Sequence, residues 1–287
     1  MHSKLDSARP WALVTGGSHG IGRALTLELL HRDINVAVVA LPDENLEDLR
    51  REYRDVHGIH LLTLGINLVT TGATDRVETW LATHGITLTY LLNNAGFGRG
   101  GLIEHTPWPE YRTMLQLNNQ VMVDLCYRFL EQLKQTGGAI LNMSSMEATL
   151  PLPYKTVYTG TKAFVFSFSL ALRQELRYHG VGLTVLCPGP VITNEDGMRR
   201  VRAQGARAKL LVKFPNDIAP EAIDGLLSGK DVVRPGWLVR ALILTSYVTP
   251  RRLRMRILER LFSKYREDEL PLRVATTPLV VEERLTE

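Results

Sequence analysis

Along the first 190 residues, short runs of apolar and β-branched residues alternate with segments whose apolar positions repeat at helical period. Such runs predict buried strands, and the amphipathic segments between them predict helices. The predicted strands are Trp11–Val14, Asn35–Ala40, Ile59–Leu64, Leu88–Asn93, Ala139–Met143 and Gly182–Cys187, with helices around Leu25–Leu30 and Leu46–Tyr53. Repeated strand–helix–strand units predict an α/β fold with a doubly wound parallel sheet and helices on both faces.

The pattern changes after Thr193. Residues 194–229 predict one or two helices with weak apolar faces and many charges, and a last strand is expected at Asp231–Arg234. In the following basic segment one helical stripe collects Leu253, Ile257, Leu258, Leu261 and Phe262, and the opposite face is rich in Arg. We therefore expect one domain over residues 1–249, followed by a basic amphipathic helix and an extended tail over residues 250–287.

A glycine loop follows the first predicted strand, in the sequence Thr15-Gly-Gly-Ser-His-Gly-Ile-Gly22. Glycines at a strand-to-helix junction let the backbone turn tightly and approach a pyrophosphate, whose charge the helix N-terminus favours. The spacing is G-x-x-x-G-x-G and not the commoner G-x-G-x-x-G, so the loop alone is equally compatible with a simple tight turn. Its place in an α/β pattern favours a dinucleotide site.

The end of the second predicted strand bears on the choice of dinucleotide. In NAD enzymes an acidic residue near this point holds the ribose 2′-hydroxyl. Here the strand ends in Ala40-Leu-Pro42, with Asp43 beyond it and no Arg to take a 2′-phosphate. His19 and Arg23 are alternative sources of positive charge. The missing acid favours NADP(H) over NAD(H).

Tyr158 and Lys162 lie four residues apart at the head of an apolar helical segment, which puts both side chains on one helix face. An ammonium group beside a phenol stabilises the phenolate and lowers the pKa of the tyrosine, as an acid/base at neutral pH requires. Further polar motifs close or follow the other strands, where open α/β sheets bind ligands. These are Asn93-Asn-Ala-Gly96, Asn118, Ser145 and Cys187-Pro-Gly-Pro-Val-Ile-Thr193.

This set of motifs, in this order and spacing, resembles the short-chain dehydrogenase/reductase family from about Trp11 to Thr193. The segments NNAGFGRGG, VYTGTKAFVFSFSLALRQELR, LCPGPV and RPGW are similar to one reductase-type branch, mostly uncharacterised and bacterial, with a basic C-terminal helix. The resemblance implies a Rossmann-type fold and an NAD(P)-dependent oxidoreductase (EC 1.1.1.-) that transfers hydride to or from a carbonyl carbon.

The resemblance also implies a role for each matching residue. Tyr158 would be the acid/base, Ser145 would hydrogen-bond the carbonyl oxygen, Lys162 would bind the nicotinamide ribose, and Asn118 would hold a water linking Lys162 to solvent, with Asn119 as the alternative. The implied cofactor-binding residues are Gly16, Ser18, His19, Gly20, Ile21, Gly22, Leu41, Asn67, Leu68, Asn94, Ala95, Gly96, Tyr158, Lys162, Pro188, Gly189, Val191 and Thr193.

Two positions depart from the family pattern. Asn67 stands where many relatives carry the Asp that binds adenine, and an amide can still donate and accept hydrogen bonds. Leu41 stands where relatives that use NADP often carry Arg.

The predicted substrate residues are mostly apolar: Phe97, Met146, Leu152, Tyr154 and Pro190. They favour a hydrophobic ketone, such as a 3-oxoacyl or other long-chain compound, although apolar loop residues can equally serve packing. The segment 194–229 is expected to close over this substrate as a lid. We expect an NADP(H)-dependent carbonyl reductase. The alternatives are NAD-dependent oxidation of a secondary alcohol and, outside enzymes, a non-catalytic nucleotide-sensing regulator.

Charge and composition limit the classes of partner that we expect. Between Arg199 and Lys264 fifteen Lys or Arg and five Asp or Glu give a net charge of +10, so the remainder carries −6. Residues 250–264 could therefore meet an anionic membrane surface or an acidic carrier, or pack on their own domain or a second subunit, which we favour. The family implies a homodimer or homotetramer. No metal-ligand spacing, nucleic-acid module, signal peptide or disulfide framework is recognised, so we expect no metal, no nucleic acid and a cytoplasmic protein, with a peripheral membrane location as the alternative.

Overall fold

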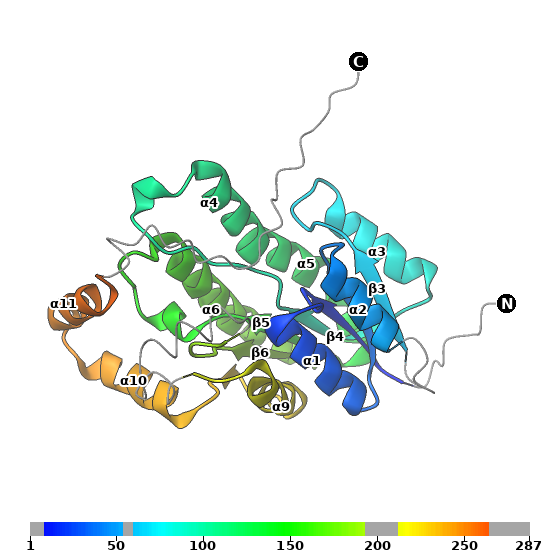
Figure 1. Cartoon of the computed structure of the whole chain (residues 1–287). Coiled ribbons are helices and arrows are strands. Elements are labelled where there is room, and N and C mark those ends of the chain that lie inside the picture. The colour runs from blue at the N-terminus through cyan, green and yellow to red at the C-terminus, as the bar shows by residue number, and fades with distance from the viewer. Residues whose placement is uncertain (1–8, 54–59, 193–211, 264–287) are drawn as a thin grey trace, which may run out of the picture.

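The computed structural model describes residues 9–53, 60–192 and 212–263 (Figure 1). Its centre is a parallel sheet of seven strands in the order β3-β2-β1-β4-β5-β6-β7. The strands are β1 (Trp11–Thr15), β2 (Asn35–Ala40), β3 (Leu61–Gly65), β4 (Leu88–Asn93), β5 (Ala139–Met143), β6 (Gly182–Leu186) and β7 (Val232–Val233). After β3 the chain crosses back to β4, so the topological switch point, where such sheets bind ligands, lies between the neighbouring strands β1 and β4.

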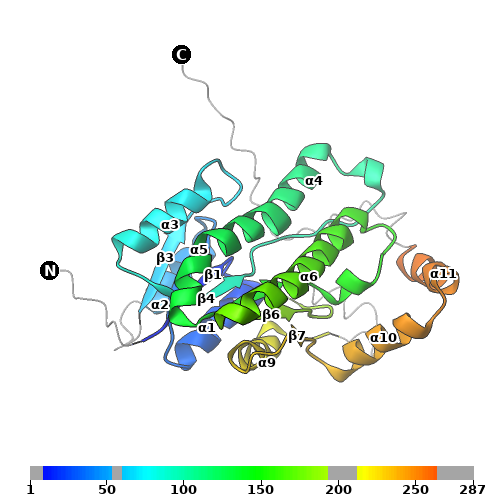
Figure 2. The ribbon, with the colours of Figure 1, turned by 180° about the vertical axis from the view of Figure 1, so that it is seen from behind.

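Helices cover both faces of the sheet, as Figures 1 and 2 show from opposite sides. One layer holds α1 (Gly20–His31), α2 (Glu44–Glu52) and α9 (Pro215–Leu227); the other holds α3 (Ala73–Thr83), α4 (Trp108–Leu115), α5 (Met122–Thr136) and α6 (Thr156–Leu176). Alternate residues of β1 serve the two layers: Ala12 and Val14 pack toward α1, whereas Trp11 and Leu13 pack toward α5. This double burial explains why the strands read as continuous apolar runs.

The predicted doubly wound α/β fold is therefore confirmed. The predicted bounds of β2, β4 and β5 agree with the structure, and β1 extends one residue further, to Thr15. The third strand begins at Leu61, while Ile59 lies outside the described residues. The last strand is shorter than expected, because only Val232 and Val233 pair with β6.

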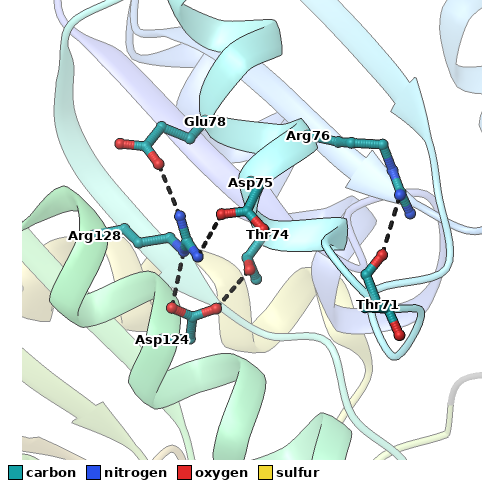
Figure 3. A network of polar contacts seen from close by, with 7 residues as sticks. All are labelled: Thr71, Thr74, Asp75, Arg76, Glu78, Asp124 and Arg128. Carbon is teal, nitrogen blue, oxygen red and sulfur yellow. Dashed lines mark hydrogen bonds and ion pairs between the residues drawn. The ribbon is translucent and has the colours of Figure 1, made fainter.

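A polar network joins α3 to α5 on the face away from α1 (Figure 3). The Arg128 guanidinium lies 2.7 Å from a carboxylate oxygen of Asp75, 2.9 Å from one of Glu78 and 2.8 Å from one of Asp124. The Thr74 hydroxyl donates to the second oxygen of Asp124 at 2.5 Å. One cation thus fixes the spacing of two helices that pack on the same side of the sheet.

The segment after β6 corrects one expectation. Within the predicted weakly apolar stretch 194–229, α9 carries a fully buried face against α1, formed by Ile218, Ala219, Ala222, Ile223 and Leu226. Helix α9 completes a helical layer on the sheet. This packing does not support a lid role for the part of residues 194–229 that α9 occupies. The remainder of the predicted lid falls mainly on residues 193–211, which lie outside the described residues.

Two further helices, α10 (Trp237–Val248) and α11 (Arg251–Phe262), lie side by side at one end of the molecule in both views (Figures 1 and 2). Leu258 of α11 is buried against Leu150 and Leu152, with Met146, Met255 and Phe262 packed around them. The basic helix therefore packs on its own domain through one face. No helix among the described residues is long and apolar enough to cross a membrane.

Candidate active site

The glycine loop between β1 and α1 is held by the segment that follows β4. The Asn94 side-chain amide donates to the carbonyl oxygens of Thr15 and Gly16 at 3.0 and 3.1 Å, and the Thr15 hydroxyl accepts from the backbone of Asn94 and Ala95 at 3.0 Å. A Cβ at Gly22 would lie 2.0 Å from the Gly16 oxygen and 2.4 Å from the Asn94 amide nitrogen. Only glycine lets the first turn of α1 approach this closely.

The loop fits the phosphates of a dinucleotide. His19 precedes α1 in an extended conformation and makes no side-chain capping hydrogen bond, and no acidic residue stands in the first turn. Backbone N–H groups at a helix start that no side chain caps, in a cradle that a Cβ at Gly22 would fill, favour an anionic ligand.

The predicted cofactor residues come together along one edge of the sheet, because parallel strands end on the same side. Ser18 and Leu68 are buried, Leu41 is exposed just after β2, and Asn67 accepts a hydrogen bond from the backbone of Val69 just after β3. Pro188, Gly189 and Val191 follow β6, and Val191 pairs with Lys213 in a parallel bridge. Thr193 lies outside the described residues.

Three of the four predicted catalytic residues meet between β5 and α6. Ser145 is the second residue after β5, and Tyr158 and Lys162 occupy the first two turns of α6. The Lys162 ammonium donates to the Met143 carbonyl oxygen at 3.0 Å and lies 5.8 Å from the centroid of the Tyr158 ring. The Ser144 hydroxyl donates to the Lys162 carbonyl oxygen at 2.8 Å, which ties α6 to the end of β5.

Burial and one carboxylate set the protonation of this group. Burial raises the pKa of the Tyr158 hydroxyl, the Glu147 carboxylate raises it further, and hydrogen bonding with Ser145 opposes both. Burial lowers the pKa of the Lys162 ammonium to about 8, against the opposing influence of Cys187 and Glu147. Removing a group from water disfavours its charged form, which is why the two pKa values move in opposite directions.

The fourth predicted catalytic residue, Asn118, lies in a π-helical turn over Gln116–Val121, between α4 and α5. Its amide nitrogen donates to the Phe97 carbonyl oxygen at 2.9 Å and to the Thr161 hydroxyl at 3.0 Å, and its oxygen accepts from the Phe97 N–H at 3.1 Å. The alternative, Asn119, donates to the Thr161 carbonyl oxygen. A Cβ at Gly96 would lie 2.8 Å from Asn118 Oδ1 and 3.6 Å from Lys162 Nζ, so Asn118 borders the same site.

The predicted substrate residues divide into two groups. Leu152 is buried in the small cluster with Leu258, and Met146 packs at the edge of that cluster. Tyr154 has a positive φ of 65°, and its hydroxyl lies 3.4 Å from Glu259 of α11. Phe97 follows β4 and is bonded to Asn118 through its backbone, and Pro190 follows β6, where its carbonyl oxygen accepts from the Lys213 N–H at 3.1 Å. Leu152 therefore serves packing in this structure.

Two residues at the site, Gly98 and Glu147, were not predicted from the sequence. Gly98 lies on the Tyr158 ring, because a Cβ there would be 2.7 Å from Tyr158 Cδ2. Glu147 pairs with Lys155 at 2.8 Å while its second carboxylate oxygen is buried without a hydrogen-bond partner. Glu147 stands only two residues after Ser145, and that spacing was the available signal. The role of Gly98 depends on a contact across 60 residues that no local pattern reveals.

Comparison with known proteins decides the family. The model of the short chain dehydrogenase family matches residues 10–203. The chain belongs to the short-chain dehydrogenase family. This is a family of NAD(P)-dependent oxidoreductases, and the matched residues include Ser145, Tyr158 and Lys162.

Two curated relatives give the range of similarity. The probable oxidoreductase EphD of Mycobacterium tuberculosis is 30% identical over 240 residues, which is 77% of this chain and 40% of that protein. The chain thus spans less than half the length of this relative. The very-long-chain 3-oxoacyl-CoA reductase of Rattus norvegicus is 27% identical over 215 residues, which is 71% of this chain and 66% of that protein.

Two solved structures show the same fold. A 7β-hydroxysteroid dehydrogenase superposes with a TM-score of 0.79 at 22% identity and covers 89% of this chain and 99% of its own. A short-chain dehydrogenase from Sphingobium yanoikuyae in complex with NADPH superposes with a TM-score of 0.71 at 25% identity and covers 83% and 93%. The confirmed expectations are therefore the family, the fold and the class of enzyme.

Proposed function

We propose that this short-chain dehydrogenase reduces an apolar ketone with NADPH, and that Tyr158 donates the proton. The protonation of Tyr158 is the observation that supports reduction over oxidation. Burial and the Glu147 carboxylate both raise the pKa of its hydroxyl. A hydroxyl that stays protonated at neutral pH is suited to donate a proton to a developing alkoxide.

The residues then have distinct tasks. A nucleotide held at the glycine loop would supply the hydride that the carbonyl carbon accepts. The Ser145 and Tyr158 hydroxyls donate hydrogen bonds to the carbonyl oxygen, the C=O double bond becomes a C–O single bond, and the Tyr158 proton passes to that oxygen. The resulting phenolate is stabilised by the Lys162 ammonium, which the Met143 carbonyl oxygen holds beside the ring.

The choice of NADPH rests on the end of β2. Leu41 is half-exposed at the strand tip, and Asp43 is occupied in capping α2, where its carboxylate accepts from the Leu46 N–H at 3.1 Å. No carboxylate is thus poised to hold a ribose 2′-hydroxyl at this point, and the Sphingobium yanoikuyae relative was solved with NADPH. Arg23, a candidate for the 2′-phosphate, pairs with Glu52 at 2.5 Å, so its charge is already partly compensated.

The apolar substrate is supported by the apolar residues Phe97, Met146 and Pro190, which follow β4, β5 and β6, and by the similarity to a 3-oxoacyl-CoA reductase. The packing of Leu152 on α11 leaves fewer apolar side chains for the substrate than the sequence suggested. A long-chain or 3-oxoacyl ketone remains the class that we propose.

The test combines nucleotide binding with turnover. Fluorescence titration should show tighter binding of NADPH than of NADH, and NADPH should be consumed with lipophilic ketones. Tyr158→Phe should lower kcat by about 10² to 10⁴-fold while the protein still binds NADPH more tightly than NADH, whereas the control at an exposed tyrosine away from the site, Tyr178→Phe, should keep kcat. Turnover of polyols and sugars alone would refute the apolar substrate, and preferred binding of NADH would refute NADPH and redirect the search to alcohol oxidation.

A further inference from the structure

Helices α10 and α11 carry apolar residues both at buried positions toward the domain and at exposed positions, so the apolar stripe of α11 is only partly covered. Toward the domain, Val239 and Ile243 of α10 and Leu258 of α11 are buried. Away from it, an outer patch of six residues is between 45 and 78% exposed, and the patch consists of Trp237, Leu244, Val248, Leu253, Ile257 and Leu261. Each helix contributes three residues at helical spacing, so the patch is two continuous stripes and not a scatter of single side chains.

A stripe of cations runs beside the apolar stripe of α11. Arg252, Arg256 and Arg260 each precede one of Leu253, Ile257 and Leu261 by a single residue, and all three arginines are exposed. Within the described ranges none of them forms an ion pair, and Glu259 is the one acidic residue of this helix, against five arginines. The outer surface of α11 is therefore apolar and cationic at once.

We propose that this outer patch docks the protein on the surface of an anionic lipid bilayer. Apolar side chains flanked by arginines match the boundary between acyl chains and anionic headgroups, where the former enter hydrocarbon and the latter meet phosphate. Trp237 has the amphipathic ring that this boundary favours. Each helix has twelve residues, too short to cross the bilayer, so both would lie in its plane.

Charge decides against a second copy of the chain as the occupant. A two-fold contact through this face would set the same arginine stripe against itself, because such an interface uses one patch from both subunits. Like charges brought together without an anion between them repel. An anionic lipid surface supplies the missing counter-charge, whereas a second copy does not.

Docking would place the membrane next to the candidate active site. The inner face of α11 packs on Leu150 and Leu152, in the loop that begins with Ser145, and Tyr154 of that loop contacts Glu259. A ketone dissolved in the bilayer would then leave it close to the reacting groups. This last step rests on the proposed function, while the docking itself does not.

Flotation of the full-length chain tests the docking without any assay of activity. Vesicles of phosphatidylcholine containing about a third phosphatidylserine should carry the protein upward at low salt. Arg252→Glu/Arg256→Glu/Arg260→Glu and Ile257→Asp/Leu261→Asp should each lower the partition coefficient at least tenfold, and about 1 M salt should do the same to the wild type. Matched controls at exposed sites of other elements, Arg51→Glu and Tyr178→Asp, should float like the wild type.

Thermal unfolding and nucleotide titration of each variant would show that the fold is retained. Failure of the wild type to float on anionic vesicles would overturn the proposal, as would flotation of the arginine variant like wild type. If the wild type is instead a dimer in light scattering and Ile257→Asp/Leu261→Asp is a monomer, a second copy covers the patch and the proposal is wrong. None of these outcomes depends on whether an apolar ketone is the substrate.

Discussion

Glu147 is the charged residue that acts on the protonation of Tyr158. Its carboxylate pairs with Lys155, leaves one buried oxygen without a partner, and raises the pKa of the Tyr158 hydroxyl. The same negative charge would oppose the formation of the phenolate at Tyr158. The raised pKa keeps Tyr158 protonated at neutral pH, although it also makes the hydroxyl a weaker acid. The protonated hydroxyl is the form from which carbonyl reduction starts, whereas alcohol oxidation needs the phenolate.

Glu147→Gln removes that charge and should lower the pKa of Tyr158. The limb of the pH profile of kcat/KM that reports Tyr158 should then move to lower pH, by about half to one pH unit. Lys155→Gln is the matched control, since loss of the compensating cation should move the same limb to higher pH. Identical profiles for all three proteins would mean that Glu147 does not act on Tyr158.

The buried ammonium of Lys162 lowers the stability of the folded protein. Its pKa falls from the ordinary 10.5 to about 8 on folding, so the folded state binds fewer protons than the unfolded state between these values. Stability linked to this group therefore rises as pH increases from about 8 to 10.5. Below about 8 the full cost of burying the ammonium applies.

Lys162→Met should consequently stabilise the protein at pH 7 while abolishing turnover. We expect a gain of about 1–2 kcal/mol in the free energy of unfolding, because the loss of the hydrogen bond to the Met143 carbonyl oxygen offsets part of the relief. The gain should shrink as the pH rises through 8 toward 10.5. Denaturant unfolding at several pH values measures it, and the partly exposed Lys134→Met should show no such trend; a stability loss in Lys162→Met at pH 7 would contradict the argument.

At the scale of elements, Arg128 joins α3 to α5 through three carboxylates (Figure 3). In a network, one guanidinium loses its side-chain freedom once but pairs with several carboxylates. The network therefore contributes more to stability than an isolated surface pair does. Without the cation, Asp75, Glu78 and Asp124 would form a cluster of like charges between the two helices.

Arg128→Leu should lower the free energy of unfolding by about 1 kcal/mol or somewhat more, which corresponds to a decrease of a few degrees in Tm. Calorimetry at low and high salt would check it, because screening should reduce the difference from the wild type. Arg51→Leu breaks an isolated, exposed pair with Asp48 and should change Tm little. An equal effect of the two substitutions would remove any special role for the network.

Over the whole molecule, the sheet and most of the site could be predicted because their signals are local. Buried parallel strands read as apolar runs, and Ser145, Tyr158 and Lys162 stand in short motifs at strand and helix ends. The helix α9 was underestimated because Pro220, Asp217 and Glu221 mask an apolar face that is fully buried. Asn94 stays a predicted cofactor residue, but the hydrogen bonds of its amide to Thr15 and Gly16 could not be predicted, because they span nearly 80 residues and follow only from strand order.

The α1 side of the sheet also has a consequence for the nascent chain. Its helical layer is completed by α9 and its edge strand β6 is paired by β7, and both lie far later in the sequence than α1 and β6. At ribosomal speeds of about 5–20 residues per second, the 45 residues between the end of β6 and the start of β7 take about 2–9 seconds to emerge. For that interval β6 presents an open, apolar strand edge to solvent or to a chaperone. Translation through residues 187–233 is therefore the period in which this protein is most exposed to misassembly.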